Sequence, residues 1–71
     1  MRWKAWVPDD IEGEIKWLVI EYDKHDTGGY FTYYHLHENF AYDSWHASLE
    51  DALESAYGQF NIDRQDWIKI G

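Results

Sequence analysis

The segment "SLEDALESAYGQFNI" (48–62) has the strongest periodic pattern in the chain, and it decides the predicted fold. Its apolar residues recur at i, i+3, i+4, i+7 and i+11, which places one stripe along a helix: Leu49, Ala52, Leu53, Ala56 and Phe60. Ser48 is a good N-cap, and Asp51 three residues later completes a capping box. We therefore predict an amphipathic helix over about 48–60 that packs on a sheet.

The end of this helix is also marked in the sequence. Asn61 is expected to be the left-handed residue after the helix, with Ile62 contacting Tyr57 in a Schellman motif. Gly58 then falls inside the last turn, at a propensity cost of about 1 kcal/mol. A close approach of the helix to a strand would explain a glycine there.

The segments before the helix have the composition of strands. "EIKWLVIEYD" (14–23) is apolar on both of its period-2 faces, which predicts a central strand covered on both sides. "KHDTGG" (24–29) supplies a turn in which Gly28 and Gly29 can take positive φ values. "YFTYYHLH" (30–37) then forms a hairpin with the first strand.

A second reversal at "ENF" (38–40) leads into "FAYDSWH" (40–46) as a third strand, and "RWKAWV" (2–7) and "WIKI" (67–70) are weaker strand candidates. The prediction is one α+β domain over 1–71, a three- to four-stranded antiparallel β-meander packed against one α-helix. The pattern leaves open which sheet face the helix covers. The expected core residues are Trp17, Val19, Tyr34, Leu36, Trp45, Leu49, Leu53, Ala56 and Phe60.

The composition narrows the classes of partner. Fourteen acidic and six basic residues give a net charge of −8, which disfavours direct binding to nucleic acid or to anionic membranes. A basic protein partner is favoured, although an acidic surface also keeps a chain with 20% aromatic residues in solution. No stretch approaches the roughly 18 apolar residues of a membrane span. The absence of cysteine excludes a disulfide scaffold and a thiolate metal site, and the cytoplasm is the expected compartment.

The stretch "YHLHENFAYDSWH" (34–46) contains three of the four histidines. On a strand, His35 and His37 share a face, and such a pair can bind a transition metal if further ligands complete the set. The candidates are Glu38, Asp43 and His46. An imidazole beside tyrosines is also an ordinary surface arrangement, and this interpretation is preferred, so no metal and no cofactor are expected.

The sequence evidence for a catalytic site is weaker than the evidence for a metal site. Asp43, Ser44 and His46 have the residue types of a triad, but side chains alternate along a strand, so Asp43 would point away from the other two. "TGG" lacks the lysine and hydroxyl residue of a phosphate-binding loop. We therefore expect no enzyme.

The segment "DSWHASLEDALESAYGQFNIDRQDW" (43–67) resembles small bacterial proteins, some of them immunity proteins of toxin systems. "GGYFTYYHLH" followed by "SLEDALESA" resembles the β-β-β-α fold of HicB-type antitoxins. Together the two resemblances cover most of residues 28–67. They imply a role as an inhibitor, and they bring no catalytic motif, so they assign no functional residue.

These observations favour a small acidic bacterial protein that binds and inhibits a basic protein, such as a toxin or a nuclease. Its acids would steer association, in the limit by imitating nucleic-acid phosphates, and exposed aromatic rings would anchor the partner. The expected partner-binding residues are Tyr33, His35, Glu38, Asp43, Glu50 and Glu54. Two alternatives stay open: a small metal-binding domain using His35, His37 and His46, and a homodimer formed through an edge strand.

Overall fold

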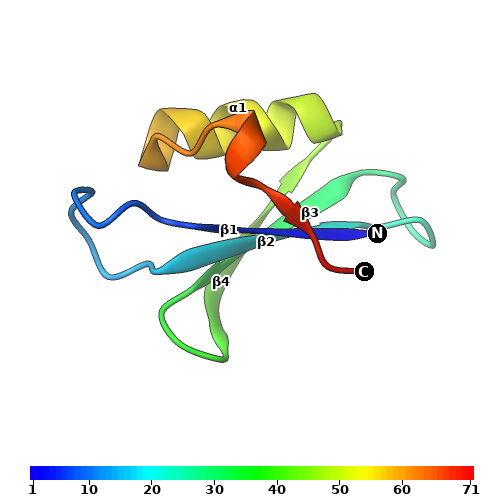
Figure 1. The fold of residues 1–71 in the computed structure, drawn as a ribbon. Helices are drawn as coiled ribbons and strands as arrows, with labels where there is room; N and C mark the ends of the chain where they lie inside the picture. Colours follow the sequence, from blue (N-terminus) through cyan, green and yellow to red (C-terminus); the bar gives the residue numbers. More distant parts are fainter.

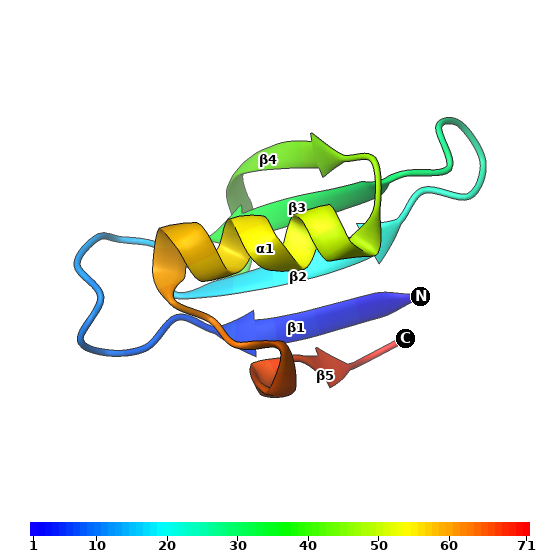
Figure 2. The same ribbon diagram turned by 90° about the horizontal axis from the view of Figure 1, so that it is seen from above.

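Five antiparallel strands and one α-helix make up the fold, and the computed structural model describes the whole chain, residues 1–71. The elements are β1 (Arg2–Trp6), β2 (Trp17–Tyr22), β3 (Tyr30–His35), β4 (Phe40–His46), α1 (Leu49–Phe60), a 3-10 turn (Arg64–Asp66) and β5 (Ile68–Lys69). The strand order is β4-β3-β2-β1-β5, and α1 lies across one face of the sheet (Figure 1, Figure 2). The α+β class is confirmed, and the sheet has one strand more than the predicted maximum.

The extra strand arises because the two weaker strand candidates, 2–7 and 67–70, both form strands (β1 and β5) and pair with each other. The helix carries the chain from the β4 edge across the sheet to the outer edge of β1, where β5 adds (Figure 2). Only two residue pairs join β1 to β5, Trp3 with Lys69 and Lys4 with Ile68. The Ile70 N–H also donates to the Arg2 carbonyl (2.8 Å), so the two chain ends lie side by side. A strand this short has too few residues for a clear period-2 signal.

The helix begins and ends at the predicted residues. Ser48 Oγ accepts a hydrogen bond from the Asp51 N–H (3.1 Å), and Asn61 takes the left-handed conformation with φ 58°. The Asn61 N–H donates to the Tyr57 carbonyl (2.9 Å), which is the single bond of the αL motif. The Schellman bond from the Ile62 N–H does not form, so the predicted motif was wrong, although Tyr57 and Ile62 line the same depression. Ile62 instead turns into the core, where it is 1% exposed.

The prediction for Gly58 was also wrong. This residue is exposed, and a Cβ added to it would meet no atom within 4 Å. The helix therefore does not approach a strand there, and no packing contact requires a glycine.

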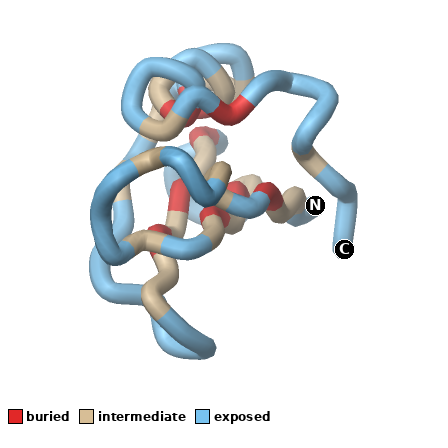
Figure 3. The backbone as a smooth tube through the Cα atoms, turned by 60° about the vertical axis from the view of Figure 1, so that its left-hand side comes forward, coloured by how far each residue is buried: buried red, intermediate tan, exposed pale blue.

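The hydrophobic core lies between α1 and one face of the sheet, and the buried stretches in Figure 3 gather there. It is formed by Ala5, Leu18, Tyr34, Ala56 and Ile62, and Ile20 of β2 is fully buried beside them. Of the predicted core residues, Tyr34 and Ala56 are buried, Phe60 packs against the core, and Leu36, Leu49 and Leu53 are half-buried. The predicted cover on both sides of β2 was wrong, because the chain has one helix and it covers the face of Leu18 and Ile20. Trp17 and Val19 point to the opposite side.

Trp45 was also placed wrongly in the core, and its position explains one of the turn glycines. Its ring is 47% exposed and lies over Gly29, where an added Cβ would come within 2.5 Å of the indole. The Trp45 Nε1–H donates to Thr27 Oγ1 (2.8 Å). Gly28 has the expected positive φ of 72°, whereas Gly29 is needed for this close approach.

Candidate functional site

The sheet face opposite α1 is uncovered, and we call it the open face. Because Leu18 and Ile20 point to the helix, their neighbours on β2 and the cross-strand partners of those neighbours point to the open face. It includes Trp6, Trp17, Val19, Glu21, Phe31, Tyr33, His35, Phe40, Asp43 and Trp45. Large apolar side chains remain half exposed there, including Trp6 (59%) and Phe40 (51%). A monomer seldom leaves such a contiguous surface unused.

Aromatic rings form a continuous strip on the open face across four strands. Trp6 of β1 contacts Trp17 of β2, with ring centroids 5.4 Å apart, and Trp17 stacks on His35 of β3 at 5.0 Å. His35 and Tyr33 of β3 both contact Phe40 of β4, at 6.2 Å and 4.9 Å. We call these residues the aromatic strip: Trp6, Trp17, His35, Phe40 and Tyr33.

One end of the aromatic strip carries a cation from its own chain. The Lys4 ammonium lies 4.2 Å from the centroid of the Trp6 ring and 5.0 Å from that of Trp17. Both distances are within the range of cation–π attraction. The ring faces at this end are therefore already partly engaged, whereas Tyr33 and Phe40 at the other end have no such neighbour.

A β-bulge places Phe40 in the aromatic strip. Tyr34 pairs with Tyr42, but the next residue, His35, pairs with Phe40, so Ala41 is an extra residue in β4. In a regular strand Phe40 and Tyr42 would share a face. The bulge changes this alternation and bends the strand. Phe40 joins the open face as a result, while Tyr42 stays on the helix side and stacks on Tyr34.

Beside Phe40 the open face is hollowed, and the tip of the β3–β4 hairpin projects away from α1 at this end (Figure 1). The hollow has a volume of about 490 Å³ and is lined by Arg2, Val19, Glu21, Tyr33, His35, Phe40, Asp43 and Ile70. Three predicted partner-binding residues, Tyr33, His35 and Asp43, thus lie together. Glu21, Phe40 and the tryptophans of the aromatic strip were not among the predicted partner-binding residues. The apolar character of both faces of 14–23 was the signal that could have revealed an open face.

The pKa of the Tyr33 phenol reflects the burial and the charges of the hollow. Burial raises the pKa of its phenol above the usual value, and the negative charges of Glu21, Asp43 and Asp23 raise it further. The chain has one ion pair, between Glu50 and Arg64. No lysine or arginine nitrogen lies within 4 Å of a carboxylate oxygen of Glu21 or Asp43. The lining of the hollow therefore carries two carboxylates and one guanidinium, and Arg2, although it is the cross-strand partner of Glu21, forms no ion pair with either carboxylate.

We expect the pKa of the Tyr33 phenol to lie above about 10, and to fall in Asp43→Asn because one negative charge is removed. Since the folded-state pKa is raised, the associated stability is fully present below about pH 10 and is lost as the pH rises through the folded pKa. Ring carbon shifts followed by NMR against pH measure this pKa. Glu54→Gln on the helix is the control and should leave it unchanged. A Tyr33 pKa that does not respond to Asp43→Asn would contradict the assignment.

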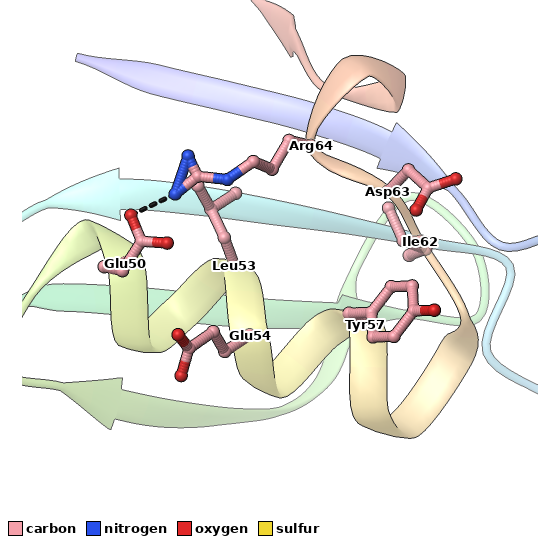
Figure 4. A pocket seen from close by; sticks show the side chains of 7 residues that line it. All are labelled: Glu50, Leu53, Glu54, Tyr57, Ile62, Asp63 and Arg64. Atoms are coloured by element: carbon pink, nitrogen blue, oxygen red, sulfur yellow. Dashed lines mark hydrogen bonds and ion pairs between the residues drawn. The ribbon is translucent and has the colours of Figure 1, made fainter.

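The other predicted acids do not join the hollow. Glu50 and Glu54 lie on α1 and line a separate depression of about 200 Å³ with Arg64 (Figure 4). Glu50 accepts a hydrogen bond from the Arg64 guanidinium, and this bond and the charge of Glu50 raise the pKa of Arg64. Glu38 is exposed in the β3–β4 turn. The predicted set is therefore divided between two sides of the molecule.

The histidines are divided in the same way. His35 is on the open face, His37 is exposed in the turn, and His46 is on the helix side, where its Nε2 lies 2.9 Å from Ser44 Oγ. Asp43 points to the open face, away from Ser44 and His46, as strand alternation predicts. No group of three or more histidine or acidic side chains is arranged to hold a metal ion.

Comparison of the chain with protein-family models, with curated proteins and with solved structures finds no match. The single helix, α1, has too few residues and too little apolar character to cross a membrane. Functional assignment therefore depends on the geometry of the open face.

Proposed function

We propose that this is a non-enzymatic binding protein that docks its open face onto a basic protein and inhibits it, in the manner of an immunity protein or antitoxin. The observation that carries the proposal is the uncovered aromatic strip. Tryptophan and tyrosine are enriched among residues that dominate binding energy, and five rings, each close to the next, provide a preformed aromatic centre. The expected compartment is the cytoplasm, since a chain without cysteine needs no oxidising environment.

The distribution of charge supports a basic partner. Seven of the fourteen acids lie in the loops at the ends of the sheet: Asp9, Asp10, Glu12, Glu14, Asp23, Asp26 and Glu38. An aromatic centre with a charged rim is the usual anatomy of a protein interface. Acidic loops of this kind would speed the approach of a basic protein. They would repel a second copy of the chain, which also carries a net charge of −8.

Inhibition would result because the bound protein covers a functional surface of its partner. A protein docked on the open face would have its own basic surface occluded, and a nuclease or toxin uses such a surface to reach nucleic acid. Glu50 and Glu54 would then stay outside the interface, because they lie on α1. This restricts the predicted partner-binding residues to the open face and its acidic rim.

An array of purified proteins spanning acidic to basic isoelectric points tests the proposal. The array is probed with the natural chain and with the double variant Trp6→Ser/Phe40→Ser, whose two rings lie outside the buried core. We expect the specific partners to be basic and to bind the double variant at least about 10-fold more weakly, as for loss of interface anchors.

The matched control is Tyr57→Ser, because Tyr57 is a ring of similar exposure (56%) on the helix side. It should retain binding. The proposal would be contradicted if the bound proteins were not predominantly basic. It would also be contradicted if Tyr57→Ser weakened binding as much as Trp6→Ser/Phe40→Ser does. Sedimentation supplies a second check: we expect a monomer, and a dimer dissociated by Trp6→Ser/Phe40→Ser would assign the open face to a second copy instead.

A further inference from the structure

We propose that the hollow beside Tyr33 receives one arginine side chain of the partner, with its guanidinium against the Tyr33 and Phe40 rings and paired with Glu21 and Asp43. This inference rests on the proposed function and names the anchor within that interface. It assigns a chemical class of ligand to one place on the open face.

Rings and acids converge at this place. The Tyr33 and Phe40 centroids are 4.9 Å apart with the rings inclined by 57°, which forms an aromatic corner. Asp43 is the cross-strand partner of Tyr33. Glu21 lies on the same face two residues beyond Val19, the partner of Tyr33 in β2. A flat cation that enters the hollow would therefore meet ring faces and two carboxylates together.

The carboxylates are free to accept a cation from outside. The one arginine in the hollow, Arg2, makes no ion pair with Glu21 or Asp43. Its side chain extends over the C-terminal residue, where a Cβ on Gly71 would lie 3.2 Å from Arg2 Nε. The charges that raise the pKa of Tyr33 are the charges that would stabilise a guanidinium. Hence two features, the ring geometry and two carboxylates without an ion pair, favour a cation.

Arginine suits the hollow better than lysine. A guanidinium is planar, stacks on aromatic faces, is weakly hydrated and offers five N–H donors in a fork that matches carboxylates. A lysine ammonium is compact and strongly hydrated, so entering a partly buried corner costs it more. The hollow, about 490 Å³, is within the size of sites that take whole small molecules.

The probe is Nα-acetyl-arginine methylamide, titrated into the full chain and followed by NMR. We expect saturable shifts of the Tyr33 and Phe40 ring protons. The neutral isostere Nα-acetyl-citrulline methylamide should bind at least about 10-fold more weakly, because it keeps the shape and loses the charge-assisted bonds. The lysine analogue should also be weaker. Equal binding of citrulline, or of lysine, would overturn the guanidinium assignment.

Isosteric variants locate the site. Glu21→Gln and Asp43→Asn should each weaken arginine binding several-fold, and Glu50→Gln on the helix side should leave it unchanged. Ring-proton dispersion confirms that each variant is folded. Shifts that map to the depression around Arg64, or affinity insensitive to both open-face variants, would overturn the inference.

The outcomes separate this inference from the proposed function. If basic partners depend on Trp6 and Phe40 while the arginine probe causes no shift, the anchor assignment alone fails. If the arginine probe binds as described but the array gives no basic partner, the hollow is an arginine site and the proposed function fails.

Discussion

Replacing Leu18 with alanine should lower the free energy of unfolding by about 2–5 kcal/mol. The Leu18 side chain is 0% exposed and is part of the core under α1 with Ala5, Tyr34, Ala56 and Ile62. Removal of three carbon atoms loses their transfer free energy and leaves a cavity that close-packed neighbours cannot fill. A domain is stable by only about 5–15 kcal/mol, so this change shifts the urea midpoint strongly.

The matched control is the next residue in the strand. Val19 points to the open face and is half-buried, so Val19→Ala should cost about 1 kcal/mol or less. Urea denaturation followed by tryptophan fluorescence measures both variants. Equal losses would mean that both faces of β2 are covered, as sequence analysis expected and the structure denies.

Replacing Ile62 with alanine is the second change with a large expected effect, again about 2–5 kcal/mol. Ile62 is 1% exposed and follows directly after Asn61, the left-handed residue that ends α1. It is therefore the residue that joins the end of the helix to the core, and the chain beyond it leads to β5. We expect the variant to lower the unfolding midpoint and to increase amide exchange in β5.

Ile68→Ala controls for residue type in the same C-terminal segment. Ile68 is 63% exposed on the two-residue strand β5, and its truncation should change stability by no more than about 0.5 kcal/mol. Thermal unfolding and hydrogen exchange compare the two variants. A larger loss with Ile68→Ala than with Ile62→Ala would mean that the segment is held by the β1–β5 pairing rather than by the core.

Most of the secondary structure could be predicted from the sequence because its signals are local. The stripe from Leu49 to Phe60 and the Ser48 cap depend on neighbours within a few turns, and the observed helix agrees with them. The strand predicted over 40–46 matches β4 at both ends. Tyr33 and His35 were predicted on one face by strand alternation, and Asp43, which was added for its charge, lies on the same face because it pairs with Tyr33 between β3 and β4.

The parts of the site that were missed depend on contacts between distant segments. Phe40 reaches the open face only because Ala41 is bulged out of the pairing with β3, and the register of that pairing cannot be deduced from β4 alone. Glu50 and Glu54 were grouped with Asp43 by charge. Their position on α1 separates them from it, since the helix lies on the other side of the sheet.

The sequence by itself determined the helix, its caps, the central strand and the acidic character of the surface, because each depends on composition or on periodicity within one segment. Only the tertiary structure decided which face of β2 is buried. Trp17 and Val19 are as apolar as Leu18 and Ile20, so the strand has no preferred side of its own. One helix can cover one face, and the path of the chain from β4 through α1 and Ile62 to β5 places it over Leu18, leaving the aromatic strip exposed.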